Sequence, residues 1–339
     1  MSGMTRDDPL ATPDWFPMSL SHDGELKFIQ MTRDAFRQSS FHHESIVRAG
    51  DRTLRIPIGK LAGLKSSVPS HFILHTTFCG STLLARYLED LPGCFVLREP
   101  QLLRQLSFVP YSDSWFEWFT TALNLLGRAY PTDTVTIVKL HDFCNWMSGP
   151  ILDGEPRIRI VFLYNPLRTH LLQVLKDRGR RETVQKQVAD GRISRGYPMA
   201  LVPALAEAIR GELSDAQCAA ATWLINAHLC GRLLARPDAD RVLVMDGQCV
   251  ISHPQQAVLA VAGHFGLAGE DARAVLAELR PAATHAKSGK AYDSAALEAD
   301  LAAAQRMCGE EVESGIAWAC ELCPELVGVF DHARRDVAS

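Results

Sequence analysis

The segment HFILHTTFCGST (71–82), continued by LLARYLEDL (83–91), decides the fold of this chain. Its apolar start predicts a short buried strand, and the amphipathic pattern after it predicts a helix. The turn between them presents a glycine and two hydroxyls at the start of that helix. Free backbone N–H groups and the positive end of the helix dipole favour an anion there, and glycine lets the anion approach closely. We therefore expect a nucleotide phosphate to contact this loop, which consists of Thr77, Phe78, Cys79, Gly80, Ser81 and Thr82.

The loop departs from the Walker A pattern, which has a glycine five residues before the second glycine and a lysine directly after it. His75 and Ser81 occupy those two places. An ordinary strand-to-helix turn with Ser81 as its helix cap would fit the same residues. The local pattern therefore leaves both interpretations open.

Composition narrows the class of protein. The 339 residues are 47% hydrophobic and 22% charged, with a formal net charge of −4, which gives no reason to expect nucleic acid or an anionic membrane as a partner. The first residues lack a signal-peptide pattern, and no apolar run is long enough to span a membrane. Nine cysteines without regular spacing predict reduced thiols rather than a metal site. We expect a cytoplasmic protein.

Short apolar runs alternate with long helical patterns from residue 71 onward. This alternation is typical of a parallel sheet that helices cover on both faces. The expected fold is an α/β three-layer sandwich around a mostly parallel five-stranded sheet. The predicted strands are FILH (72–75), CFVL (94–97), VTIVKL (135–140), IRIVFLY (158–164) and RVLVMD (241–246).

The predicted organisation has three parts. Residues 1–67 form an N-terminal extension with a small strand pair around 45–58, based on the alternation in TLRIPI. Residues 68–300 form the sheet domain, and the mostly helical insert 165–240 is a candidate substrate lid. Residues 301–339 form a helical segment that packs on this domain.

Several motifs follow the strands in a recognisable order. The first is the 77–82 loop, and the last is a basic, glycine-containing loop. Between them come Arg98-Glu99-Pro100, Lys139-Leu140-His141, YNPLRTHLL (164–172) and RVLVMDGQCVISHPQQAVLAVAGHFGL (241–267), and the basic loop is KSGKAY (287–292). Together, over about residues 70–295, they resemble the P-loop sulfotransferases.

The resemblance implies a P-loop nucleotide-binding fold and a transferase that uses 3′-phosphoadenosine-5′-phosphosulfate as co-substrate, without a metal. It implies transfer of a sulfuryl group to the hydroxyl or amine of a small-molecule or peptide acceptor. It also implies that Lys287, Gly289 and Lys290 close over the nucleotide. The sequence is compatible with a homodimer.

Two departures from the family pattern concern charge. Phe78 stands where the family has a Lys or Arg that neutralises the bridging oxygen between phosphate and sulfate. Tyr164 and Leu172 stand where the family has the Arg and Ser that hold the 3′-phosphate. We expect Arg168 to take over the 3′-phosphate, because a guanidinium binds phosphate bidentately, and Lys139 to replace the loop cation. Further cations that could approach are Arg178, Arg180, Arg181, Lys287 and Lys290.

His141 and Glu99 are the candidate general bases. Each follows a predicted buried strand, whose carboxyl end lies at the sheet edge where ligands bind in open α/β sheets. A structural His bonded to the backbone, and an acid that precedes Pro100 at a helix start, would explain the same residues. Lys139 shares the side of its strand with His141 and completes the catalytic set.

Two other functions remain open at this stage. A nucleotide-dependent kinase would explain the missing 3′-phosphate groups but lacks the Walker lysine. A non-catalytic nucleotide-binding or regulatory protein would explain Phe78.

Overall fold

A five-stranded parallel sheet forms the centre of the computed structural model, which describes residues 12–43, 51–63, 68–189, 201–267 and 294–330 and the single positions 10, 46, 269, 274, 275 and 278. The strand order is β5-β6-β4-β7-β8. The strands are β4 (His71–His75), β5 (Cys94–Arg98), β6 (Val135–Lys139), β7 (Arg159–Tyr164) and β8 (Val242–Asp246). Each of the five predicted apolar runs is therefore a strand, and every pairing among them is parallel. This confirms the predicted α/β class.

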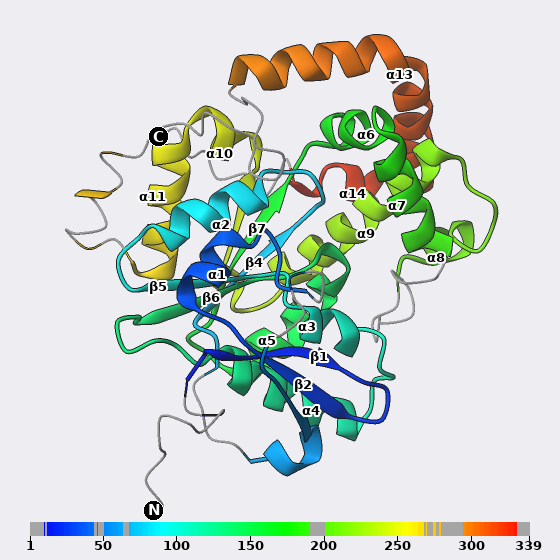
Figure 1. The fold of residues 1–339 in the computed structure, drawn as a ribbon. Coiled ribbons are helices and arrows are strands. Elements are labelled where there is room, and N and C mark those ends of the chain that lie inside the picture. Colours follow the sequence, from blue (N-terminus) through cyan, green and yellow to red (C-terminus); the bar gives the residue numbers. More distant parts are fainter. Residues whose placement is uncertain are drawn as a thin grey trace, which may run out of the picture.

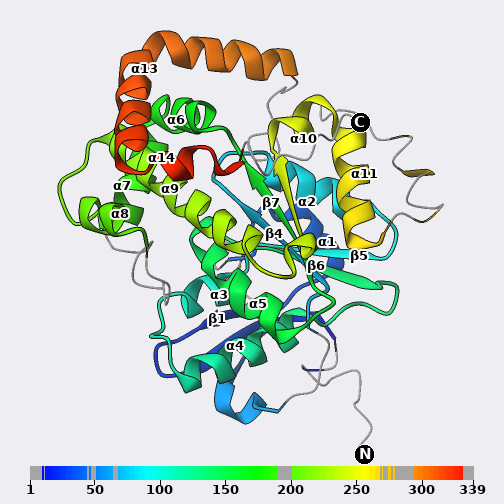
Figure 2. The ribbon, with the colours of Figure 1, turned by 180° about the vertical axis from the view of Figure 1, so that it is seen from behind.

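Helices cover both faces of this sheet, which makes the three-layer sandwich (Figures 1 and 2). Because both faces are buried, the strand residues are mostly apolar rather than alternating. One face packs against α2 (Ser81–Glu89), α10 (Gln248–Ser252) and α11 (Pro254–Phe265). The helices of the other face include α3 (Gln101–Leu106), α4 (Asp113–Leu126), η3 (Asp142–Met147), α5 (Ser148–Gly154) and α9 (Asp215–Leu234).

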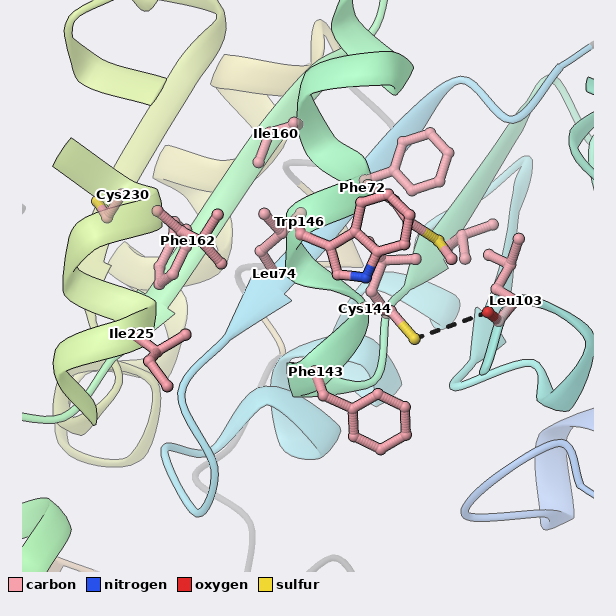
Figure 3. Close-up of a cluster of buried hydrophobic side chains, with 14 of the residues drawn as sticks. Phe72, Leu74, Leu103, Phe143, Cys144, Trp146, Ile160, Phe162, Ile225 and Cys230 are labelled. Carbon is pink, nitrogen blue, oxygen red and sulfur yellow. Dashed lines mark hydrogen bonds between the residues drawn. The ribbon is translucent and has the colours of Figure 1, made fainter. Parts of the chain in front are cut away.

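The packing on this second face is dense. Ile225 and Cys230 of α9 lie beside Phe162 of β7 (Figure 3). Cys144 of η3 lies near α3, where its Sγ is 3.8 Å from the carbonyl oxygen of Leu103. This core fixes where the carboxyl ends of the strands lie, and therefore where the loops after them meet.

The N-terminal part contains an antiparallel sheet of three strands rather than the expected pair. Its order is β1-β2-β3, and β3 covers the predicted TLRIPI alternation. The strands are β1 (Trp15–Leu20), β2 (Glu25–Gln30) and β3 (Thr53–Pro57), and the helices of this part are α1 (Arg33–Gln38) and η2 (Ile58–Leu61). The sheet packs against α3 and α4 and joins the main core.

The described parts of the 165–240 insert and of the C-terminal segment are mostly helical. The insert contains α6 (Leu167–Leu175), α7 (Arg178–Ala189), α8 (Pro203–Ala208), α9 and η4 (Ala239–Arg241). The C-terminal segment contains α13 (Ser294–Leu322), which packs on α6 and α9, and α14 (Pro324–Val327). Across the described residues, every helix is too short or too polar to span a membrane.

Candidate active site

The predicted phosphate loop lies between the carboxyl end of β4 and the first turn of α2. Gly80 caps α2 with a φ of 82°, a left-handed conformation that glycine adopts at low cost. Ser81 and Thr82 begin the helix, and both side chains are buried. The nine-residue α2 therefore begins with free N–H groups and two hydroxyl residues at this loop, an arrangement that can bind an anion.

Bonds from the end of β7 hold the loop in place. The Thr76 N–H donates to the Leu163 carbonyl, and the Asn165 N–H donates to Thr76 Oγ1 over 3.1 Å. The Asn165 side-chain amide donates to the Phe78 carbonyl over 3.0 Å. Asn165 is itself buried, and its carbonyl accepts from the Trp223 indole of α9. The loop is thus fixed before any ligand arrives.

The turn after β8 also packs against the loop. A Cβ on Gly247 would lie 1.9 Å from the carbonyl oxygen of Cys79, so only glycine allows this approach. The Gly247 N–H donates to the Tyr164 carbonyl, which ties the turn to β7 as well. Loops after three neighbouring strands are therefore packed together at one edge of the sheet.

A cavity of about 570 Å³ opens above the loop. Thr77, Phe78, Cys79, Gly80, Ser81 and Thr82 line it, together with Glu99 and His141. The structure thus brings the predicted phosphate loop and both predicted bases to one space. Lys139 lies just beneath, since its ammonium donates to Thr82 Oγ1 over 3.1 Å and to Glu99 Oε1 over 2.5 Å.

Glu99 connects the charged groups of the cavity. Besides Lys139, it lies 3.6 Å from His75 Nε2 and 4.0 Å from His141 Nε2. Burial alone would raise the pKa of Glu99, but the Lys139 ammonium and the two imidazoles outweigh burial and hold this pKa well below its ordinary value of 4.5. Glu99 is therefore an ionised carboxylate at neutral pH.

His141 has a carboxylate beside it, from its neighbour in the chain. Its Nδ1 lies 2.5 Å from Asp142 Oδ1, and its side chain is 24% exposed, whereas Asp142 is buried. Burial opposes ionisation of Asp142, yet the nearby His141 overcomes burial and lowers the pKa of this carboxyl. The Asp142 carboxylate thus lies beside Nδ1, and Nε2 lies on the side of Glu99.

Two residues of the cavity wall have strained backbones. Phe78 has a φ of 60° and Glu99 a φ of 52°, and they are the non-glycine residues with positive φ in the described part of the chain. Such conformations cost about 1–3 kcal/mol each and gather at functional sites. Both positions thus combine strain with a place in the cavity.

Sequence reasoning missed several residues that line this cavity. Phe41 and His43 reach it from the N-terminal part, and the Phe41 ring lies 5.4 Å from Lys139 Nζ. Burial, and then Arg104, lower the pKa of His43. The sequence of this segment contains no recognisable motif. Its position depends on a backbone hydrogen bond, in which the His42 N–H donates to the Arg98 carbonyl at the end of β5. The other lining residues that were missed as site residues include His75, Arg104, Asp142, Gln173, Lys176 and Asp300, whereas Arg180 was already among the further cations expected to approach.

Arg168, the predicted 3′-phosphate residue, pairs with another helix. Arg168 forms a two-bond pair with Glu313 of α13 and does not line the cavity. Tyr164 is buried and stacks on Phe330, with ring centroids 4.3 Å apart and planes 4° apart. The family's arginine position is thus used for packing. Lys287, Gly289 and Lys290 lie outside the described residues.

Comparisons with known proteins give matches among solved structures. No family model matches the sequence, and no curated protein matches it. A sulfotransferase from Alicyclobacillus acidocaldarius is similar at 15% identity over 73% of this chain and 95% of that chain, with a TM-score of 0.39. The sulfotransferase domain from the curacin biosynthetic pathway is similar at 14% identity over 75% of this chain and 98% of that chain, with a TM-score of 0.37.

Proposed function

We propose that this protein moves a sulfuryl group from 3′-phosphoadenosine-5′-phosphosulfate to a hydroxyl or amine acceptor. One observation carries the proposal: the Gly80 turn, Glu99 and His141 line a single cavity, and Lys139 bonds to Thr82 and Glu99 beneath it. An anion-binding helix start beside an oriented base is what group transfer to a nucleophile needs.

The residues of the loop fit the 5′-phosphosulfate end of this donor. The N–H groups at the start of α2 and the hydroxyls of Ser81 and Thr82 would bind its anionic oxygens. The Lys139 ammonium, bonded to Thr82, adds positive charge behind the loop. For the 3′-phosphate, Arg168 remains our proposal, and its guanidinium would exchange Glu313 for the phosphate.

His141 would act as the base for the acceptor. Its Nε2 would take the proton of the attacking hydroxyl or amine, while Asp142 keeps Nδ1 oriented. The donor supplies an S–O bond that breaks as the acceptor attacks sulfur, which leaves adenosine 3′,5′-bisphosphate. Glu99, ionised and close to Nε2, would stabilise the imidazolium that results. Positioning and charge stabilisation would therefore provide the catalysis.

Calorimetry with the Gly80→Asp variant tests this proposal. Aspartate tolerates the left-handed backbone of position 80 better than most residues, but it places a negative charge at the anion site. We expect loss of binding of adenosine 3′,5′-bisphosphate. Gly263→Asp is the matched control, because Gly263 is exposed on α11 and nothing lies within 4 Å of its added Cβ. Equal affinity in both variants would contradict the proposal.

A further inference from the structure

His42 holds a segment of the N-terminal part against the cavity. Its N–H donates to the Arg98 carbonyl over 2.8 Å, and its Nδ1 accepts from the Arg98 N–H over 3.0 Å. Its carbonyl accepts over 3.0 Å from the N–H of Gln101, the first residue of α3. His42 is buried, so these bonds fix its two neighbours in the chain, Phe41 and His43. Both neighbours line the cavity.

A second basic group reaches the same cavity from α3. Arg104 lies three residues after Gln101 on this helix, and its exposed side chain lines the cavity. Burial is the main cause that lowers the pKa of the His43 imidazole, and the charge of Arg104 is the next. His141 lowers this pKa as well, and Glu99 opposes the shift. Three basic side chains therefore lie around one part of the cavity.

The charge of this part of the cavity favours an anion. Glu99, the carboxylate that acts on His43, accepts from the Lys139 ammonium over 2.5 Å. Lys139 is buried and needs that carboxylate, because a buried charge without its partner is costly. Arg104 and a protonated His43 repel each other, and an anion that contacts both relieves this repulsion.

The strand order places these two groups on the side of the base. β5 and β6 lie on one side of β4 in the sheet, and β7 and β8 lie on the other. Arg104 follows β5, and His141 follows β6. Arg168, the proposed 3′-phosphate residue, follows β7. The anion that His43 and Arg104 favour therefore belongs beside the acceptor, on the opposite side of β4 from Arg168.

We propose that His43 and Arg104 bind an anionic group of the acceptor. The substrate is then a hydroxyl or amine compound that also carries a negative charge. This inference rests on the proposed function and names the substrate class for its site. The anion contacts His43 and Arg104 while the hydroxyl or amine faces His141. The Phe41 ring lines the same cavity and offers an apolar surface to the part of the acceptor between these two groups.

Calorimetry on the protein saturated with adenosine 3′,5′-bisphosphate tests the assignment. The probes are 4-hydroxybenzoate and its neutral counterpart 4-hydroxybenzamide, which share a hydroxyl and a ring and differ in one charge. We expect the acid to bind about ten- to hundredfold more tightly than the amide, the usual effect of one charge-assisted contact. Arg104→Ala should remove most of this preference, and Arg104→Lys should keep part of it because the charge remains. Arg157→Ala is the matched control, since Arg157 is 87% exposed and pairs with Glu155.

The pH dependence tests the contribution of His43. An anion beside an imidazole favours its protonated form, so binding of the acid is coupled to proton uptake by His43. We expect the affinity for the acid to rise as the pH falls through the range in which histidine titrates, about pH 8 to 5. The affinity for the amide should stay level, and His43→Gln should remove most of the rise. The same rise in His43→Gln would overturn the role of His43.

The remaining outcomes separate this inference from the proposed function. Equal affinity of the wild-type complex for acid and amide, or no binding of the acid, overturns the inference. A preference for the acid that survives Arg104→Ala also overturns it. If Arg104→Ala weakens binding of adenosine 3′,5′-bisphosphate itself, Arg104 belongs to the nucleotide site, so the inference fails while the proposed function stands. If Gly80→Asp binds the bisphosphate normally, the proposed function fails, and the inference fails with it.

Discussion

Glu99 is the carboxylate that lies between the basic side chains of the cavity. It contacts Lys139 directly and lies near His75 and His141. A carboxyl whose pKa is lowered on folding adds stability above its ordinary pKa of 4.5, and this contribution is lost as the pH falls toward the folded-state pKa. The stability of the protein should therefore depend on Glu99 at neutral pH and depend on it less in acid.

We predict that Glu99→Gln lowers the free energy of unfolding by about 3–5 kcal/mol at neutral pH, because Lys139 is left buried without its carboxylate. Urea unfolding should show this difference shrinking below about pH 4.5, where the wild-type carboxylate loses its advantage. Glu207→Gln is the control, since Glu207 and its partner Arg210 are both more than 70% exposed. A difference that stays constant into strong acid would contradict the account of Glu99.

The predicted role of His141 concerns rate rather than binding. We expect His141→Ala to lower turnover by about 10²–10⁴ and to leave the affinity for adenosine 3′,5′-bisphosphate nearly unchanged, as removal of a general base should. Asp142→Asn should give a smaller loss, because the amide still occupies the place beside Nδ1. Single-turnover transfer from labelled donor measures both effects. If His141→Ala weakens nucleotide binding as much as turnover, His141 is a binding residue instead.

At this scale, the sequence predicted the residues that strand ends position. Glu99 directly follows β5 and His141 lies two residues after β6, so the parallel sheet itself brings them to the cavity. It did not reveal which distant side chains meet there. The approach of Arg180 to Phe78 and the pairing of Arg168 with Glu313 depend on how α7 and α13 pack. Neither contact can be predicted from the spacing of residues along the chain.

At the scale of elements, the position of the 77–82 loop depends on its contact with the turn after β8. The turn after β8 touches the phosphate loop at Gly247, where an added Cβ would lie 1.9 Å from the Cys79 carbonyl oxygen. A side chain there must push the two turns apart. The proposed anion site should therefore be sensitive to a residue that no phosphate motif includes.

We predict that Gly247→Ala destabilises the protein by about 1–3 kcal/mol, the usual effect of an overpacked site. The same variant should weaken adenosine 3′,5′-bisphosphate, because the displaced Cys79 carbonyl belongs to the loop. Gly263→Ala, in an open position on α11, should instead be neutral or slightly stabilising. Thermal unfolding and calorimetry on both variants check this. Normal affinity in Gly247→Ala would show that the loop relaxes independently of β8.

The strands of the central sheet could be predicted, but β1 and β2 could not. The central strands are buried on both faces, so each is a mostly apolar run that the sequence displays clearly. β1 contains Pro17 at a register shift, and proline within a run argues against a strand. β2 is only partly alternating, with Leu26, Phe28 and Ile29 all buried. β1 and β2 can therefore be recognised as strands only from their pairing in the structure, where β2 pairs with both β1 and β3.

At the scale of the whole molecule, the cavity is assembled from parts far apart in the chain. Phe41 comes from the N-terminal part, the loop from β4–α2, Arg180 from the insert and Asp300 from the C-terminal helix α13. Stacking of Tyr164 on Phe330 anchors the C-terminal end against β7. Every part predicted from the sequence as separate thus contributes to the cavity or to its support.

The donor can be tested most directly by titrating the intact protein with three ligands: adenosine 3′,5′-bisphosphate, adenosine 5′-phosphate and ATP. A site for 3′-phosphoadenosine-5′-phosphosulfate recognises both phosphates of the bisphosphate. We therefore predict that calorimetry shows it binding about tenfold or more tightly than either other ligand, since one charge-assisted phosphate contact is worth that much. Binding of ATP as tight as binding of the bisphosphate would contradict the account and favour a nucleotide-dependent kinase.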